Sequence, residues 1–149
     1  MRLWHQKLIP YLDRQRLLGQ HRECCALRGK GWGKKHATVD YAFTHDFSYL
    51  VAYHYLVMDE MTKRGYNHDN NWEDIDYRGL SLPYEGGHTS ITLFKLERDA
   101  SQKGHIIYPE HNNDYLRECI NLLKEKNAPI DWEKVEKDGL VKVFKHTDK

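Results

Sequence analysis

The segment from Leu17 to His36, LLGQHRECCALRGKGWGKKH, holds the residues with the clearest chemical potential. Arg22 and Glu23 fall on a predicted amphipathic helix, which runs directly into a loop of glycines, cations and one tryptophan. A carboxylate can stabilise a developing positive charge and can move protons. Beside a cationic loop it is suited to chemistry on a polyanion, and nucleic acid is the obvious candidate.

The loop of residues 28–36 interleaves cations with three glycines and one aromatic ring. Lys and Arg neutralise phosphates, and an indole can stack on an unpaired base for about 1–3 kcal/mol. We therefore expect a stacking role for Trp32 and phosphate contacts from Arg28, Lys30, Lys34 and Lys35. The alternative is a solvated surface loop whose tryptophan packs inward. The spacing does not match a Walker loop, so a nucleoside triphosphate site is not indicated.

The ten histidines do not fall into a metal-binding motif. The sequence has no HExxH or CxxC pattern, and the acids of residues 69–76 lack the glycine of a calcium loop. We expect surface or core histidines with no bound metal and no cofactor, and a site assembled across the fold stays open. Cys24 and Cys25 fall on a predicted core face, which disfavours a thiol nucleophile.

The 149 residues (17.8 kDa) suffice for one domain with a real core, and no linker or repeat divides residues 1–149. The net charge of +1 disfavours a dedicated nucleic-acid binder, yet four cations and no acid lie between Cys24 and Val39. No apolar run reaches the roughly 20 residues that span a bilayer, and residues 1–5 lack a signal-peptide core, so we expect a cytoplasmic location. Three cysteines, two of them adjacent, suit a reducing compartment.

Helical periodicity and capping residues predict a mainly α-helical fold. The first helix runs from about Asp13 to Arg28, and on it Gly19 and Ala26 flank Glu23 to form a notch that another backbone can approach. Further helices are expected from Thr44 or Asp46 to Arg64, from Asn113 to Glu125 and from Asp131 to Lys137. Residues 66–85 indicate an irregular connection, residues 89–93 a short strand or helical turn, and residues 139–144 an isolated strand.

The first of these helices resembles the corresponding helix of the pyrimidine-dimer DNA glycosylase family, the dimer-specific endonuclease V type. His21-Arg22-Glu23 is similar to the family's aromatic-Arg-Glu motif, and Gln15 and Leu17 also match. Lys63-Arg64-Gly65-Tyr66-Asn67 resembles the end of its second helix. Tyr108-Pro109, Lys124 and Pro129 align more weakly with its C-terminal third.

The resemblance implies a single-domain helical bundle with irregular connections, whose N-terminal segment packs against the first helix. It implies a DNA glycosylase with AP lyase activity that needs no metal or cofactor. A terminal α-amine attacks C1′ of the damaged nucleotide, an imine forms, and β-elimination breaks the strand. Glu23 is then the acid/base and electrostatic stabiliser, and Arg22 holds phosphate. Because the bulky Arg2 should leave Met1 in place, the amine belongs to Met1.

The expected partner is a damaged or modified DNA duplex, with no membrane and no obligate protein partner. By the resemblance Arg2, His5 and His21 line the site, and Lys124 joins the loop cations as a DNA contact. Two alternatives stay open. One is a non-catalytic nucleic-acid-binding module on the same scaffold, and the other is a metal-dependent nuclease that uses the scattered histidines and acids.

Overall fold

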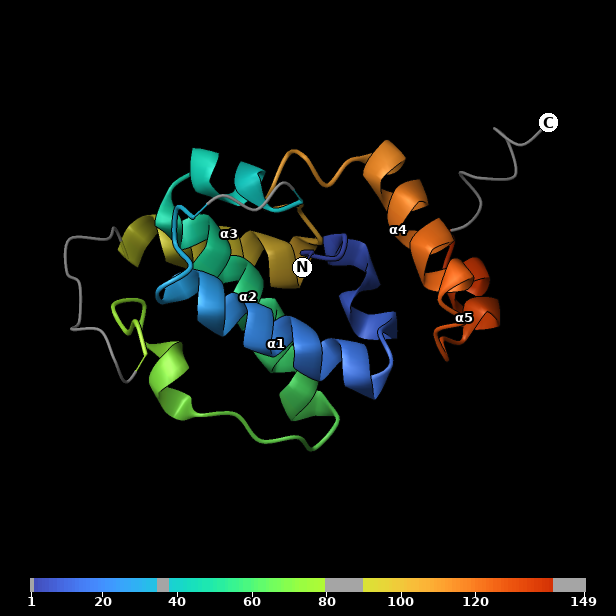
Figure 1. The fold of residues 1–149 in the computed structure, drawn as a ribbon, viewed down its shortest axis with the longest axis horizontal. Coiled ribbons are helices and arrows are strands. Elements are labelled where there is room, and N and C mark those ends of the chain that lie inside the picture. Colours follow the sequence, from blue (N-terminus) through green and yellow to red (C-terminus); the bar gives the residue numbers. More distant parts are fainter. Residues whose placement is uncertain (1, 35–37, 80–89, 141–149) are drawn as a thin grey trace.

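The computed structural model describes residues 2–34, 38–79 and 90–140 of the chain, in which all regular secondary structure is helical and there is no strand (Figure 1). The mainly α-helical fold that the sequence predicts is therefore confirmed. The elements in chain order are η1 (Gln6–Tyr11), α1 (Arg14–Arg28), η2 (Asp40–Thr44), α2 (Phe47–Lys63), η3 (Asn70–Glu73), α3 (Ser90–Lys103), α4 (Asn113–Glu125) and α5 (Trp132–Lys137).

Capping side chains set the helix ends where the sequence places them. The Asp13 carboxylate accepts from the backbone nitrogen of Arg16 at 3.4 Å and starts α1, which ends at Gly29. The carboxylate of Asp46 caps α2 through the backbone nitrogen of Ser48 at 3.0 Å. Thr44 is not the cap, because its hydroxyl donates to the carbonyl of Tyr41.

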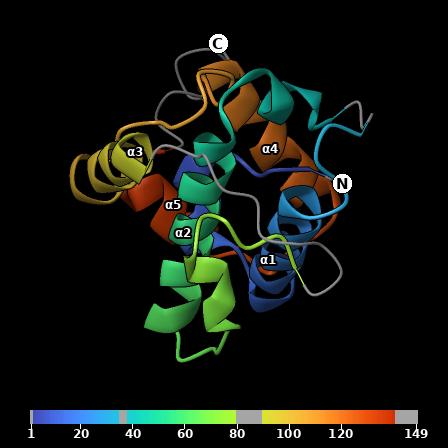
Figure 2. The same cartoon turned by 90° about the vertical axis from the view of Figure 1, so that its left-hand side faces the viewer.

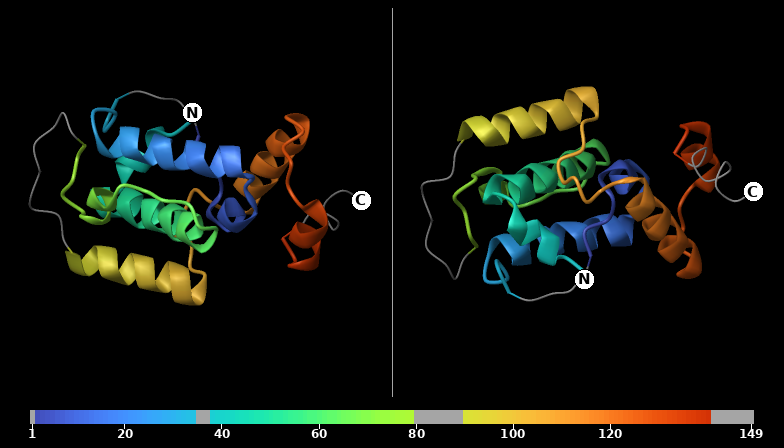
Figure 3. Two further views of the ribbon diagram at one scale, coloured as in Figure 1. Left: turned by 90° about the horizontal axis from the view of Figure 1, so that it is seen from below. Right: turned by 90° about the horizontal axis from the view of Figure 1, so that it is seen from above.

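Helix α2 lies between α1 and α3, as Figures 2 and 3 show from three directions. Being covered on two sides, it buries ten of its 17 residues, a wider face than the narrow stripe of an ordinary surface helix. Six of the buried residues follow one another at the spacing of a single helical face: Phe47, Leu50, Val51, His54, Met58 and Met61. Helix α2 is thus the core element against which α1 is positioned.

Helices α4 and α5 lie together at one end of the molecule, beside η1 (Figure 3). Helix α4 buries Leu116, Cys119, Ile120 and Leu123, which lie on one helical face. The side chain of Asp131 caps α5 through the backbone nitrogen of Lys134 at 3.1 Å. Both C-terminal helices therefore follow the predicted boundaries.

The middle of the chain departs from expectation. Residues 89–93 were expected to form a short strand or a helical turn, but α3 starts at Ser90 and runs for 14 residues. The irregular connection of residues 66–85 contains η3, and the predicted strand of residues 139–144 lies mostly outside the described residues. No helix among the described residues has both the length and the apolar character needed to cross a bilayer.

Candidate active site

The chain's N-terminal segment lies against the carboxylate of Glu23. The backbone nitrogen of Arg2 donates to Glu23 Oε2 at 3.1 Å, a contact between residues 21 positions apart. Leu3, the next residue, is fully buried in the core. The packing of the N-terminal segment against the first helix, which the resemblance implies, is therefore present.

A buried glutamine on α1 holds this segment in place. Gln20 Oε1 accepts from the backbone nitrogen of Trp4 at 2.7 Å, and its Nε2 donates to the carbonyl of Arg2 at 2.9 Å. The hydroxyl of Tyr53, from α2, donates to the carbonyl of Trp4 at 2.6 Å and lies 2.9 Å from Gln20 Oε1. Gln20 and Tyr53 are 2% and 0% exposed, so these hydrogen bonds are shielded from water.

The side chain of Arg2 extends away from Glu23 and toward α4. Its Nη1 pairs with Glu118 at 2.7 Å, and its guanidinium lies 5.6 Å from the centre of the Tyr115 ring. The hydroxyl of Tyr115 in turn donates to the carbonyl of Leu3 at 2.5 Å. Helix α4 therefore anchors the N-terminal segment from the side opposite to Gln20.

An open cavity of about 480 Å³ adjoins Glu23. It is lined by Arg2, Trp4, Gln15, Arg16, Gly19, Gln20, Arg22, Glu23, Thr38, Leu122 and Lys126. Four of these are cations, so the cavity combines one carboxylate with a cationic wall, which is the charge pattern suited to a phosphate backbone. The predicted notch is present at Gly19 but does not extend to Ala26.

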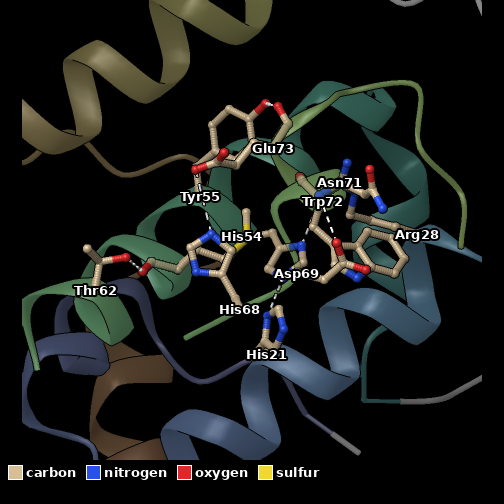
Figure 4. A network of polar contacts seen from close by, with 11 residues as sticks. His21, Arg28, His54, Tyr55, Thr62, His68, Asp69, Asn71, Trp72 and Glu73 are labelled. Carbon is tan, nitrogen blue, oxygen red and sulfur yellow. Dashed lines mark hydrogen bonds and ion pairs between the residues drawn. The ribbon is translucent and has the colours of Figure 1, made fainter. Parts of the chain in front are cut away.

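Two residues predicted to contact DNA are buried instead. Arg28, drawn beside Trp72 in Figure 4, is 0% exposed; its Nη1 donates to the carbonyl of Trp72 at 2.7 Å. Its Nη2 donates to the carbonyl of Asp74 at 2.8 Å. His5 is 1% exposed, and its Nδ1 accepts from the backbone nitrogen of Lys7. Burial lowers the pKa of His5 to about 4, which keeps it neutral at pH 7. Both predictions are wrong, because each side chain satisfies backbone groups in the interior.

His21 and Trp32 also face protein rather than the cavity. His21 Nδ1 lies 2.8 Å from Nε2 of His54, on the α2 side of α1. The Trp32 ring packs edge-to-face against Phe43 and Phe47, with centroids 4.9 and 4.8 Å away. The structure thus favours the alternative in which this tryptophan packs inward, and it places His21 away from Glu23.

The remaining predicted contacts differ in their surroundings. Lys30 and Lys34 are exposed, while Lys35 and Met1 lie outside the described residues. Lys124 does not line the cavity; its Nζ lies 5.2 Å from the centre of the Trp132 ring. Lys126, two residues later, does line it. The roles of Lys30, Lys34 and Lys35 stay predictions.

Sequence reasoning missed several lining residues that a helical pattern could have found. Gln15, Arg16, Gly19, Arg22 and Glu23 follow one another at the spacing of a single α-helical face. Drawing that face would have added Arg16 to the cations near Glu23. Trp4, Thr38, Leu122 and Lys126 reach the cavity from three other segments, and no local pattern indicates them.

Comparison with known proteins bears on this arrangement. Residues 1–74 match the family model described as pyrimidine dimer DNA glycosylase. Comparisons with curated proteins and with solved structures found no match.

The family match covers the parts of the chain that form the candidate site around Glu23. It includes the N-terminal segment, α1 and α2, and therefore Arg2, Gln20, Glu23 and Tyr53. Helices α3 to α5 lie beyond it, including Leu122 and Lys126 at the far wall of the cavity. The description of the matching family model names a DNA glycosylase, and the match confirms the resemblance on which the sequence interpretation depends.

Proposed function

We propose that this chain is a DNA glycosylase with AP lyase activity, which acts through its N-terminal α-amine and Glu23. The observation that carries the proposal is the 3.1 Å hydrogen bond from the backbone nitrogen of Arg2 to Glu23 Oε2. One residue advances the chain by at most about 3.8 Å, so an amine at position 1 lies within reach of the same carboxylate. The family match of residues 1–74 supports the same assignment.

The amine is a suitable nucleophile near neutral pH. An unperturbed α-amino group has a pKa of about 7.7–8.0, so a useful fraction is uncharged under physiological conditions. Its nitrogen attacks C1′ of the damaged nucleotide, the N-glycosidic bond breaks, and the base leaves with a proton. Loss of a proton from the amine nitrogen and opening of the sugar give an imine between protein and deoxyribose.

Strand cleavage follows from the imine. Removal of a proton from C2′ drives β-elimination, in which the C3′–O bond breaks and the 3′ phosphate departs. Water then hydrolyses the imine and frees the amine. Glu23 would transfer the protons of these steps and stabilise the cationic sugar and iminium, and the contact of its carboxylate with the N-terminal backbone supports this role.

The cationic wall of the cavity would hold the DNA backbone. Arg16 and Arg22 project from the helix that carries Glu23, and Lys126 approaches from the end of α4. Charges on separate elements can grip successive phosphates around one extruded nucleotide. Arg22 therefore keeps its proposed phosphate-binding role, and Arg16 and Lys126 join it.

Borohydride trapping tests the proposal directly. Duplex DNA with a single abasic site is incubated with the full chain and reduced with borohydride, and the product is digested for mass spectrometry. We expect a covalent adduct on the α-amine of Met1. No adduct, together with intact DNA binding, would contradict the lyase and leave the non-catalytic nucleic-acid-binding module.

A further inference from the structure

A second cluster of chemically capable side chains lies on the α2 side of α1. His21 and Cys25 are one helical turn apart on α1, and both face His54 of α2. One donor atom from each of these residues lies within 4.8 Å of the other two. None of the three residues lines the cavity at Glu23.

The ligand atoms form a triangle that suits a tetrahedral metal ion. His21 Nδ1 lies 2.8 Å from His54 Nε2, and Cys25 Sγ lies 3.9 Å from each of these nitrogens. Zinc bonds of about 2.0–2.1 Å to nitrogen and 2.3 Å to sulfur separate tetrahedral ligands by roughly 3.3–3.6 Å. Shifts of a few tenths of an ångström in each of the three ligand atoms would bring their observed separations to those of a tetrahedral zinc site. We propose that His21, Cys25 and His54 bind one divalent transition-metal ion, with zinc the best match.

His68 provides an independent reason to place a ligand here. Its side chain is 8% exposed and neither ring nitrogen has a hydrogen-bond partner, while Nε2 lies 3.6 Å from Glu73 Oε1. The ring is set edge-on to His21, with centroids 6.2 Å apart, and Figure 4 shows it beside the His21–His54 pair. Buried polar atoms without a hydrogen bond are rare, and a metal ion would satisfy one of them. His68 is therefore the candidate for a fourth ligand, from the segment that follows α2.

Arg28 fixes the orientation of His54. A guanidinium only donates, so the 3.0 Å contact from Arg28 Nη1 makes His54 Nδ1 an acceptor and leaves the ring proton on Nε2. That proton is donated to His21 Nδ1 when no metal is bound. A metal ion at His54 Nε2 takes the place of that proton, which moves to Nδ1 so that His54 binds as a neutral imidazole; the contact from Arg28 Nη1 then opens, while Nη1 keeps its hydrogen bond to the carbonyl of Trp72. Only the thiol proton of Cys25 is released.

The site would join three segments of the fold. His21 and Cys25 come from α1, His54 from the central helix α2, and His68 from the stretch before η3. An ion bound to all of them cross-links the helix that carries Glu23 to the core without reaching the substrate cavity. Its role is therefore structural, and it is independent of the amine chemistry proposed above.

Cobalt substitution provides the test. The full chain, stripped with a chelator, is titrated with Co²⁺ alone, and the visible and near-ultraviolet spectra are recorded. We expect one ion per chain, tetrahedral d–d bands, a thiolate-to-cobalt charge-transfer band, and loss of all bands when Zn²⁺ is added. Ions on surface histidines give no thiolate band, so its absence would overturn the site.

Matched variants assign the ligands. Cys25→Ser should remove the thiolate band and weaken binding at least tenfold, and His68→Gln should weaken binding tenfold while the thiolate band remains. Cys119→Ser, which alters a buried thiol on α4, should bind like the unmodified chain. Equal affinity of Cys25→Ser and Cys119→Ser would overturn the proposal.

A second measurement needs no variant. Cys25 is the one partly exposed thiol among three free cysteines, Cys24 and Cys119 being buried. Zn²⁺ should slow its alkylation in the folded chain at least tenfold, and chelation should restore the rate. An alkylation rate that does not change when Zn²⁺ is added would contradict metal binding through Cys25. This measurement uses the unmodified chain, so it holds even if a variant fails to fold.

Discussion

Gln20 binds the carbonyl oxygen of Arg2 at 2.9 Å, and Glu23, one helical turn later, accepts from the nitrogen of the same residue at 3.1 Å. Both backbone polar groups of Arg2 are thus held by α1. The first of these contacts comes from the buried Gln20 and positions the chain end, while the second joins that end to the proposed catalytic carboxylate. The catalytic role of Glu23 and the positioning role of Gln20 can therefore be tested with separate variants.

Glu23→Gln should abolish strand cleavage and leave DNA binding nearly unchanged. The amide retains the size of the side chain and can still accept from the Arg2 nitrogen, but it neither carries charge nor moves protons. General acid/base catalysis is typically worth about 10²–10⁴ in rate, so we expect a loss of that order. Single-turnover cleavage of dimer-containing duplex measures it, with filter binding as the control. Unchanged cleavage would remove Glu23 from the mechanism.

Gln20→Ala should slow cleavage at saturating DNA without weakening binding, because the N-terminal segment loses its buried anchor. The substitution leaves the Tyr53 hydroxyl without its glutamine partner, and we expect the free energy of unfolding to fall by roughly 1–3 kcal/mol. Gln102→Ala, on an exposed residue of α3, is the matched control and should change neither quantity. A normal rate for Gln20→Ala would show that the anchor is dispensable, whatever the outcome at Glu23.

Lys126→Ala should lower the salt dependence of DNA binding. Each phosphate contact contributes roughly 0.9 to the slope of log K against log salt, so the slope should fall by about one. Lys124→Ala removes the same charge two residues away, where the ammonium lies over Trp132 and not in the cavity, and it should leave the slope unchanged. If the two variants reverse these effects, the DNA lies on the other face of α4.

Arg28→Gln should destabilise the fold and leave the salt slope of DNA binding unchanged. The substitution leaves the carbonyl oxygen of Trp72 unpaired inside the protein and removes the part-buried hydrogen bond to the carbonyl of Asp74, at a cost of roughly 2–4 kcal/mol in the free energy of unfolding. Urea denaturation measures that loss. Lys30→Gln, on an exposed cation of the following loop, should alter stability by less than about 0.5 kcal/mol. A reduced salt slope for Arg28→Gln would contradict its structural role.

Stability should fall as the pH drops from 7 toward 4. Burial lowers the pKa of His5 to about 4 and that of His111 to about 3, whereas both histidines titrate near 6.5 in the unfolded chain. Between these values the unfolded state binds more protons, so acid favours unfolding by up to about 1.4 kcal/mol per pH unit for each group. Urea denaturation at pH 7 and pH 5 measures the difference. Equal free energies of unfolding at pH 7 and pH 5 would show that the pKa values of these two rings are not lowered in the folded protein.

Local sequence was sufficient for most helices and for the motif at Glu23. Asp13 and Asp46 cap α1 and α2 through hydrogen bonds to residues two or three positions away, so a short stretch of sequence is enough to predict both helix starts. The same holds for Asp131 and α5. Helix α3 lacks so clear a start, and its extent depends on packing against α2, which a local pattern does not contain.

The sequence by itself determined a helical domain, the family of its first half, and a carboxylate at position 23 next to many cations. Only the tertiary structure decided which cations face solvent. Arg28 and Lys126 are both cations, and the sequence does not distinguish their surroundings. Arg28 is buried and donates hydrogen bonds to carbonyl oxygens 44 and 46 residues away, while Lys126 lines the cavity. Burial of a charge depends on partners distant in sequence, because only the folded chain brings a buried charge the hydrogen bonds that offset its lost hydration.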